Sequence, residues 1–199
     1  EGLDLTGVKE AEKEMRERLA AVGLAYFIMA SGGKGLHVVA PAAAPSWEAF
    51  KNFAEAMARA MAADSPERYL AKASKSDRAG RIFIDYLRNG RGATAVAPFS
   101  CRVRPGAPVA WPLAWDQLSR LKDARPASVL TAPSLIGKWR ADPWEGYFDL
   151  RQTLPAVATK GRPSAKARAR TSGSSSWRSA VVHTTPPSSD SQMQSPEMA

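Results

Sequence analysis

The sequence predicts an α+β domain in which helices flank a mixed or antiparallel sheet. Apolar residues recur at helical spacing in residues 8–22 and 46–62, whereas residues 24–30 and 36–40 are short apolar runs of strand length. Residues 81–87 (RIFIDYL) form the clearest strand, because β-branched and aromatic residues dominate them. With 199 residues, the chain is long enough for one hydrophobic core but short for two full domains.

The first part of the chain is expected to form a helix, a hairpin and a second helix. The helical spacing of residues 8–22 ends at Gly23, which suits a left-handed cap. The two apolar runs 24–30 and 36–40 are joined by a glycine-rich turn, so they are predicted to pair as adjacent strands. Ser46 is a suitable N-cap for the second helix, and the apolar stripe of that helix predicts core packing.

The remaining elements are predicted from weaker signals. The serine–proline pair 65–66 indicates another helix start, and a short helix is expected around residues 115–121. The strand 81–87 is stopped by the turn-forming sequence RNGRG. From residue 155 to 199 the composition changes to Ser, Thr, Pro, Ala, Lys and Arg, which predicts a disordered basic tail and leaves 1–154 as the folded domain.

Composition narrows the class of partner. The formal net charge is +9 and the pI is about 10.0, which favours a polyanion such as nucleic acid or an acidic membrane surface. Cys101 is the only cysteine, so no intramolecular disulfide forms, and with only two histidines no zinc cluster is available. A reduced, cytoplasmic setting fits best. No apolar run approaches the roughly 20 residues of a membrane span. The opening residues contain no export signal and resemble the interior of a longer chain.

The turn SGGKGLH, residues 31–37, has the composition of a phosphate site. Its glycines, Gly33 among them, allow backbone N–H groups to point into one concavity. Lys34 adds positive charge and Ser31 adds a hydroxyl group, and both suit a triphosphate. His37 follows at the start of the second strand of the hairpin.

Two features of this turn leave its role open. It is not a Walker A loop, because Ile28 and Gly35 hold the places where that motif has its first glycine and its Ser or Thr. A solvated hairpin turn with an incidental lysine explains the same residues. His37 is correspondingly either a half-buried histidine of the sheet or a phosphate ligand.

Asp85 lies within the strand 81–87 and is expected to be buried. Strand alternation places it on the same side as Phe83 and Leu87, among apolar neighbours. An isolated buried charge is too costly, so this carboxylate must be protonated, bound to a metal ion, or paired with an arginine such as Arg81 or Arg88. The strand alone does not decide between an ion pair and a metal role.

Basic residues are concentrated around this strand. Residues 68–104 contain nine Lys and Arg side chains against only Asp77 and Asp85. Charged stretches are commonly solvated surfaces, but this one brackets the Asp85 strand and would focus a polyanion toward it. A phosphate-like turn, a strand carboxylate and a basic surround together indicate metal-assisted phosphoryl or nucleotidyl transfer.

Two long motifs carry a family resemblance. SGGKGLHVVAP (31–41) and GRIFIDYLRNGRGATAVAPFSCRVRPGAP (80–108) closely resemble the polymerase domain of bacterial ATP-dependent DNA ligase D, a member of the archaeo-eukaryotic primase superfamily used in non-homologous end joining. The match covers most of residues 1–150, including DPWEGYF (142–148). The resemblance implies a primase-polymerase-like fold. It also implies an enzyme that adds nucleotides, often ribonucleotides, to DNA 3′ ends with divalent Mn or Mg.

The resemblance assigns roles to individual residues. The serine, lysine and histidine of the turn would lie around the incoming nucleoside triphosphate, which gives Ser31, Lys34 and His37 this role, with Gly33 in the same loop. Asp85 would be the third catalytic carboxylate of the family and would bind metal near the primer 3′ hydroxyl.

Further basic residues and partners follow from the same resemblance. Arg78, just before the Asp85 strand, would reach a phosphate, and Arg102 or Arg104 would contact nucleotide or template. The implied partners are DNA ends, ribo- or deoxyribonucleoside triphosphates, and Ku together with a ligase domain or protein. A cytoplasmic, nucleoid-associated location is expected, without a membrane partner.

One departure from the family pattern is important. The family places an Asp-x-Asp metal pair on a strand just before the helix that corresponds to residues 8–22, but here Asp4 is followed by Leu5 and Thr6. Two-metal chemistry needs several carboxylates. We therefore expect a polymerase-domain fragment that is incomplete at its N-terminus and inactive by itself. The alternative is a basic module that grips DNA ends without chemistry. A membrane-surface protein is less well supported, because the basic residues are not interleaved with an apolar helix face.

Overall fold

The computed structural model describes residues 5–44, 46–74, 76–78, 80–155 and 178–185. Within them, no helix is both long enough and apolar enough to cross a membrane. The helices are α1 (Thr6–Ala21), α2 (Trp47–Asp64) and α3 (Ala132–Ile136), with single 3₁₀ turns η1 (Ser76–Arg78), η2 (Leu87–Asn89) and η3 (Trp115–Gln117). The strands are β1 (Phe27–Ala30), β2 (Leu36–Ala42), β3 (Tyr69–Leu70), β4 (Ile82–Asp85), β5 (Trp111–Leu113) and β6 (Arg178–Thr185).

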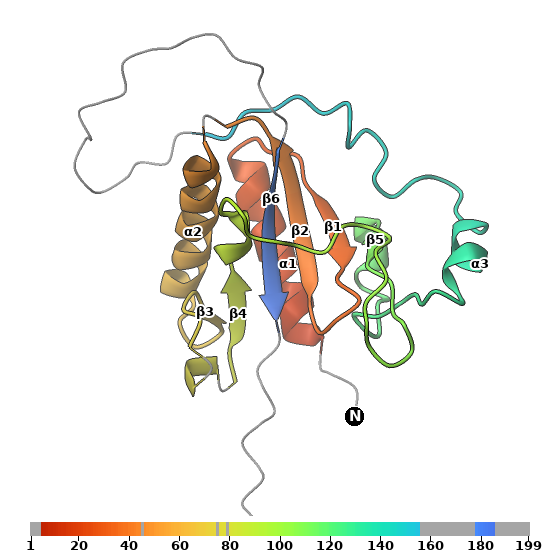
Figure 1. The fold of residues 1–199 in the computed structure, drawn as a ribbon. Coiled ribbons are helices and arrows are strands. Elements are labelled where there is room, and N and C mark those ends of the chain that lie inside the picture. The colour runs from red at the N-terminus through yellow and green to blue at the C-terminus, as the bar shows by residue number, and fades with distance from the viewer. Residues whose placement is uncertain (1–4, 45, 75, 79, 156–177, 186–199) are drawn as a thin grey trace, which may run out of the picture.

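The strands form one sheet of order β3-β4-β6-β2-β1-β5 (Figure 1). Every neighbouring pair is antiparallel except β3 and β4, which are parallel. The predicted α+β class with a mixed sheet is therefore confirmed. The hairpin of β1 and β2 is also confirmed, with Met29 in register with His37 and Ala30 with Leu36.

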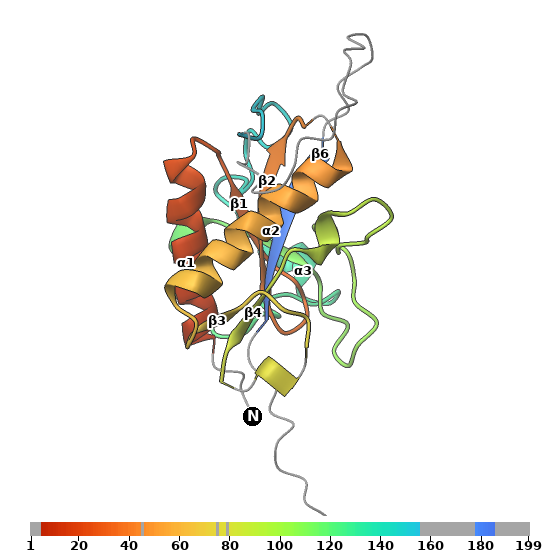
Figure 2. The same cartoon turned by 90° about the vertical axis from the view of Figure 1, so that its left-hand side faces the viewer.

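Helices α1 and α2 cover the same face of the sheet, as the side view in Figure 2 shows. Their buried side chains, such as Met15 and Phe53, pack with Val38 of β2 and Ile84 of β4 in one core cluster. Helix α2 begins where the sequence predicts, because the Ser46 side chain accepts a hydrogen bond from the backbone N–H of Ala49 at 3.1 Å. Burial of these helix faces stabilises the sheet from one side only.

The opposite face is covered by loops and aromatic residues from later in the chain. Trp144 is 9% exposed, and its indole Nε1 donates a hydrogen bond to the carbonyl of Ile28 at 2.9 Å. It packs with Met29 and Val39, whose side chains face away from α1 and α2. The candidate functional site lies on this second face.

Two predicted elements have a different form in the structure. The pair 65–66 does not begin a helix. Ser65 follows the end of α2, and the backbone N–H of Tyr69 donates to the Ser65 carbonyl at 3.0 Å before β3 starts. Proline is common just after a helix end as well as in a first turn, and composition does not separate the two cases. The short helix expected at 115–121 is the single 3₁₀ turn η3.

The predicted disordered tail requires a correction for eight of its residues. Arg178–Thr185 form β6, which pairs with β2 along seven residues and with β4 along three. Figure 1 shows this strand between β4 and β2, in the middle of the sheet. The segment RSAVVHTT is rich in β-branched residues, and it supplies backbone partners to two strands that would otherwise have unpaired edges. The rest of residues 156–199 lies outside the described residues.

Candidate functional site

The sheet face opposite the helices borders a cavity of about 580 Å³. Its basic groups are His37 of β2, Arg88 of η2 and Arg102 from the loop that precedes β5. None of the described residues that line it carries a carboxylate. The other lining residues are Thr94, Ala95, Val96, Ala97, Ser100, Cys101 and Val103.

The sheet register brings His37 and Asp85 into one row. His37 of β2 and Asp85 of β4 are each in register with residue 183 of β6, which lies between them. Because neighbouring strands are about 4.8 Å apart, the two backbones are separated by about 10 Å. Residues in register share a face, and Ile84, next to Asp85, packs with the helices. Both side chains therefore lie on the cavity side, where they are buried.

Asp85 is paired with an arginine, as one of the sequence alternatives predicted. Its Oδ2 lies 3.5 Å from Nε of Arg88, and its Oδ1 accepts a hydrogen bond from the backbone N–H of Leu87 at 2.9 Å. Arg81, the other candidate partner, instead donates to the backbone carbonyl of Asp77 at 2.5 Å. Arg88 thus stabilises the buried carboxylate and also contributes positive charge to the cavity.

The described residues do not form the carboxylate cluster that a two-metal centre needs. Asp85 supplies one carboxylate, and both of its oxygens already have partners. Nowhere in the described part of the chain do three His, Cys, Asp or Glu side chains come together in a way that would hold a metal ion. A pair of divalent ions requires several carboxylates. The metal implied by the resemblance is therefore not accommodated by these residues.

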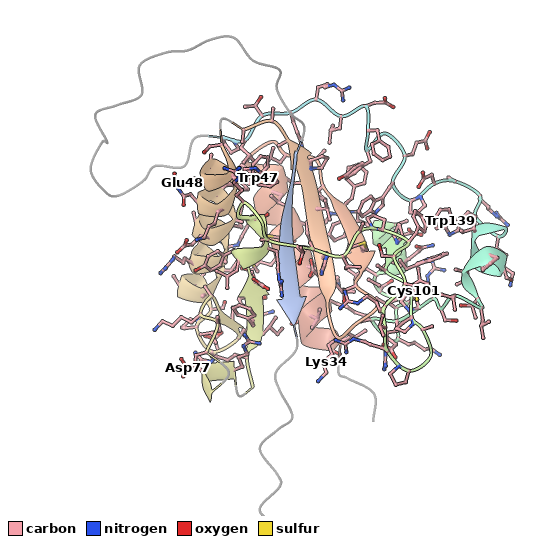
Figure 3. All side chains as sticks on the ribbon, in the orientation of Figure 1. Lys34, Trp47, Glu48, Asp77, Cys101 and Trp139 are labelled. Carbon is pink, nitrogen blue, oxygen red and sulfur yellow. The ribbon has the colours of Figure 1, made fainter. Side chains whose placement is uncertain are left out.

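The glycine-rich turn is held together by its own serine. The Ser31 hydroxyl donates to the Gly35 carbonyl at 2.6 Å and accepts from the Gly33 N–H at 3.2 Å. Ser31 is 3% exposed, whereas Lys34 is exposed at the tip, which Figure 3 shows at the lower end of the hairpin. The predicted phosphate contacts of Ser31 and Gly33 stay a prediction, because in the structure both groups are engaged within the turn.

Gly32 connects this turn to the basic cavity. Its φ is +64°, and a Cβ added there would lie 3.0 Å from Cγ of Arg102 and 3.0 Å from the backbone carbon of Val109. Only glycine combines this backbone conformation with so close an approach. The hydrogen bond from the Arg102 N–H to the Pro108 carbonyl, at 2.8 Å, holds the arginine in the strand-like segment that faces the turn.

The remaining predicted arginines are placed elsewhere. Arg78 does not line the cavity. Its Cζ lies 4.1 Å above the ring centroid of Phe83, and its Nη2 donates to the Ala73 carbonyl at 2.9 Å. Arg104, the alternative to Arg102, is exposed and lies outside the cavity lining. The structure therefore brings His37 and Arg102 together and leaves Arg78, Arg104 and Lys34 outside this cavity.

Sequence reasoning missed the cavity role of the segment 94–103. Thr94, Ser100 and Cys101 contribute polar groups to the lining, yet this stretch has neither helical nor strand periodicity. Arg88 was considered as a partner of Asp85 and as one of nine basic residues around the strand, but not as a lining residue of a cavity. One signal could have revealed this region. Small residues dominate the sequence between Arg91 and Arg102, and small side chains leave room for a ligand.

Comparison with known proteins identifies the family. The family model described as "LigD, primase-polymerase domain" matches residues 1–144. The chain belongs to this family. The match spans the glycine-rich turn, the Asp85 strand and every described residue that lines the cavity.

Similar proteins agree with this membership. The chain is 38% identical over 141 residues to the multifunctional non-homologous end joining protein LigD of Pseudomonas aeruginosa, a match that covers 70% of this chain and 17% of that protein. It is 33% identical over 120 residues to the LigD of Mycolicibacterium smegmatis, covering 60% of this chain and 16% of that protein. The chain thus spans about one sixth of these relatives.

A solved structure shares the fold. The polymerase domain from Mycobacterium tuberculosis ligase D, determined in complex with DNA, matches with a TM-score of 0.58 and 30% sequence identity. The match covers 66% of this chain and 50% of that domain. The predicted LigD polymerase resemblance is therefore confirmed by the family match, by sequence relatives and by the fold.

Proposed function

We propose that this chain is part of a DNA end-joining primase-polymerase and that its basic cavity binds the triphosphate of the nucleotide to be added to a DNA 3′ end. The observation that carries the proposal is the convergence of His37, Arg88 and Arg102 on one cavity whose described lining has no carboxylate. Family membership supports it, because relatives of this chain are named as end-joining LigD proteins.

The chemistry of the lining suits a polyphosphate. Guanidinium groups donate paired hydrogen bonds to phosphate oxygens with a geometry that an ammonium group lacks. Arg88 and Arg102 supply two such groups, and Thr94 and Ser100 add hydroxyl donors. The exposed Lys34, in the glycine-rich turn that precedes His37, adds positive charge that attracts a polyanion toward the cavity.

Nucleotidyl transfer itself needs more than the described residues provide. By family resemblance Asp85 would lie near the primer 3′ hydroxyl, where a metal-dependent step takes place. A single carboxylate that is already paired with Arg88 does not assemble two ions. We therefore propose nucleotide and DNA-end binding for this chain, and nucleotidyl transfer only where further carboxylates are supplied. Mn or Mg as the metal, and Ku and a ligase domain as partners, are part of the same proposal.

Equilibrium binding of a fluorescent ATP analogue tests the cavity directly. His37→Ala and Arg102→Ala should each weaken binding by about tenfold, because each removes a charge-assisted or polar phosphate contact. Arg104→Ala is the matched control, since Arg104 is a neighbouring exposed arginine outside the lining. Equal losses for Arg102→Ala and Arg104→Ala would mean that only diffuse positive charge is involved, and would contradict the proposal.

The alternative is a DNA-end-binding module that uses no nucleotide. The observation that favours it is that Asp85, beside the cavity, is already paired with Arg88, and that the described residues contain no cluster of three side chains that would hold a metal ion. Such a module would bind an overhanging DNA end with strong salt dependence, and added nucleotide would leave the affinity unchanged. Primer extension by this chain should yield no product under either interpretation, whereas nucleotide-dependent tightening of DNA binding is expected only for a polymerase-type site.

A further inference from the structure

A second cavity, of about 540 Å³, lies on the other side of the loop 94–103, which forms one wall of the basic cavity. Ala97 and Ser100 line the basic cavity, whereas Pro98 and Phe99, between them in sequence, line this second cavity. Phe99 has a φ of +64°, which is rare for a residue with a side chain. This conformation accompanies the turn that separates the two cavities.

The wall of the second cavity is a series of aromatic rings built on a fixed base. Trp144 is anchored by its hydrogen bond to the Ile28 carbonyl, and Tyr147 stacks on it with a ring-centroid distance of 5.0 Å and an interplanar angle of 25°. Phe148 meets Tyr147 edge to face at 5.0 Å. Phe148 is 86% exposed and Phe99 is 50% exposed. Large exposed rings supported by a rigid base are characteristic of interaction sites.

The charge of this cavity is opposite to that of its neighbour. Three exposed carboxylates, those of Asp142, Glu145 and Asp149, line it, and none of its described lining residues is Lys, Arg or His. The next basic residue of the segment, Arg151, donates to the carbonyls of Phe148 and Leu150 and lies outside the lining. The chain as a whole has a net charge of +9, so the charge at the rim of this cavity is opposite in sign to that of the whole protein.

This combination argues against a nucleic acid as the ligand. Exposed aromatic rings can stack on unpaired bases, but single-strand binding sites combine such rings with a basic groove for the backbone. Here the phosphates next to a stacked base would face three carboxylates. A cationic ligand, in contrast, gains from the carboxylates and from the faces of the rings, since Lys and Arg are attracted to aromatic π-systems.

We propose that this cavity, the acidic aromatic pocket, binds a basic segment of a partner protein. An apolar side chain of that segment occupies the space beside Phe99 and Phe148, and flanking Lys or Arg residues pair with Glu145 and Asp149. The pocket is separated from the nucleotide cavity by a single loop, so the partner is held beside the nucleotide site without blocking it.

Fluorescence anisotropy with a labelled synthetic peptide, Lys-Arg-Pro-Phe-Arg-Lys, tests the proposal on the full chain. Its charge-reversed counterpart, Glu-Asp-Pro-Phe-Asp-Glu, should bind about tenfold more weakly or not at all. Phe148→Ala should weaken binding of the basic peptide by about tenfold, and Phe148→Tyr should restore it because the ring is retained. Glu145→Lys should also weaken binding, by several-fold.

Matched controls separate the pocket from general surface effects. Leu130→Ala removes another side chain that is 88% exposed, and Glu67→Lys reverses another exposed carboxylate, both outside the pocket. Neither should change peptide affinity. The proposal is overturned if the charge-reversed peptide binds equally well, or if Leu130→Ala matches Phe148→Ala. It is also overturned if Phe148→Ala weakens binding of a labelled oligothymidylate instead of the peptide, which would assign the pocket to single-stranded DNA.

Discussion

Asp85 and Arg88 form an ion pair across one turn of chain, with Oδ2 and Nε 3.5 Å apart. The Asp85 side chain is 10% exposed, whereas about half of the Arg88 side chain is exposed, and Arg88 lines the basic cavity. A single arginine therefore connects the buried strand residue with the cavity in which we place the nucleotide. The same pairing explains how Asp85 remains inside a largely apolar sheet.

Removing Arg88 should destabilise the fold, because Asp85 then loses its cationic partner while it stays buried. We expect Arg88→Ala to lower the free energy of unfolding by about 1 to 2 kcal/mol, a value limited by the exposure of the arginine. Urea unfolding measures this. The control is Arg120→Ala, which removes a largely exposed pair with Asp116 and should change stability by less than about 0.5 kcal/mol. Equal losses of unfolding free energy in the two variants would mean that the Asp85–Arg88 pair stabilises the fold no more than a surface pair does.

Gly32 should not tolerate a side chain. Gly32→Ala places a Cβ 3.0 Å from Arg102 and from Val109 in a left-handed backbone, so it should both destabilise the protein and displace Arg102. Gly106→Ala has the same type of backbone strain, with φ +81°, but meets nothing within 4 Å. We expect Gly32→Ala to lower the unfolding free energy by at least about 1 kcal/mol more than Gly106→Ala. Only the first change should also weaken binding of the ATP analogue. Similar losses of stability and of nucleotide binding in Gly32→Ala and Gly106→Ala would contradict the close approach of Gly32 to Arg102 and Val109.

Stability should fall at alkaline pH because of Tyr69. Burial, aided by the nearby Glu14 carboxylate, raises the pKa of Tyr69 well above its usual value near 10. Its contribution is present below about pH 10 and is lost as the pH rises further, since the unfolded chain then releases a proton that the folded protein retains. Tyr69→Phe should reduce the stability loss between about pH 8 and about pH 11 by about 1 kcal/mol in urea unfolding. If Tyr69→Phe loses as much stability over this pH range as the parent protein does, Tyr69 is not the cause of the alkaline destabilisation.

Strand β6 should be essential to the sheet. Thr184 is in register with Leu36 of β2 on one side and with Ile84 of β4 on the other. Its backbone N–H therefore points toward one of these two paired strands. Thr184→Pro should therefore lower the unfolding free energy by about 3 kcal/mol, and Thr184→Val, which keeps the N–H, should have a much smaller effect. If the proline variant unfolds like the parent protein, the central placement of β6 is wrong.

Much of the fold followed from local patterns. The spacing of apolar residues in α1 and α2, and the Ser46 cap, predicted both helices to within a few residues. Asp85 was predicted to be buried, with an arginine partner as one of the alternatives, and strand alternation gave its face correctly. These features depend on short-range periodicity and on the cost of burying charge, both of which are visible in a single sequence.

The parts that failed depend on long-range contacts. Strand β6 was hidden because the composition around it is typical of disorder, and its stability comes from two partner strands far away in the chain. The cavity wall formed by Thr94, Ser100 and Cys101 was missed because irregular segments carry no periodic signal. The hydrogen bond from the Ser31 hydroxyl to the Gly35 carbonyl was also not visible in the sequence, because the backbone geometry of the turn sets it, and the phosphate role of Ser31 stays a prediction.

Alkylation of Cys101 provides the most direct test that nucleotide occupies the basic cavity. Cys101 is exposed, is the only cysteine of the chain, and lines the cavity beside Arg102. Figure 3 shows it on the loop that borders the sheet. With triphosphate at a concentration that occupies about nine tenths of the sites, the rate of reaction with iodoacetamide should fall by about tenfold. Arg102→Ala, which weakens binding about tenfold, should reduce this protection to about twofold at the same nucleotide concentration. An alkylation rate that is unchanged by bound nucleotide would place the nucleotide elsewhere and contradict the proposed site.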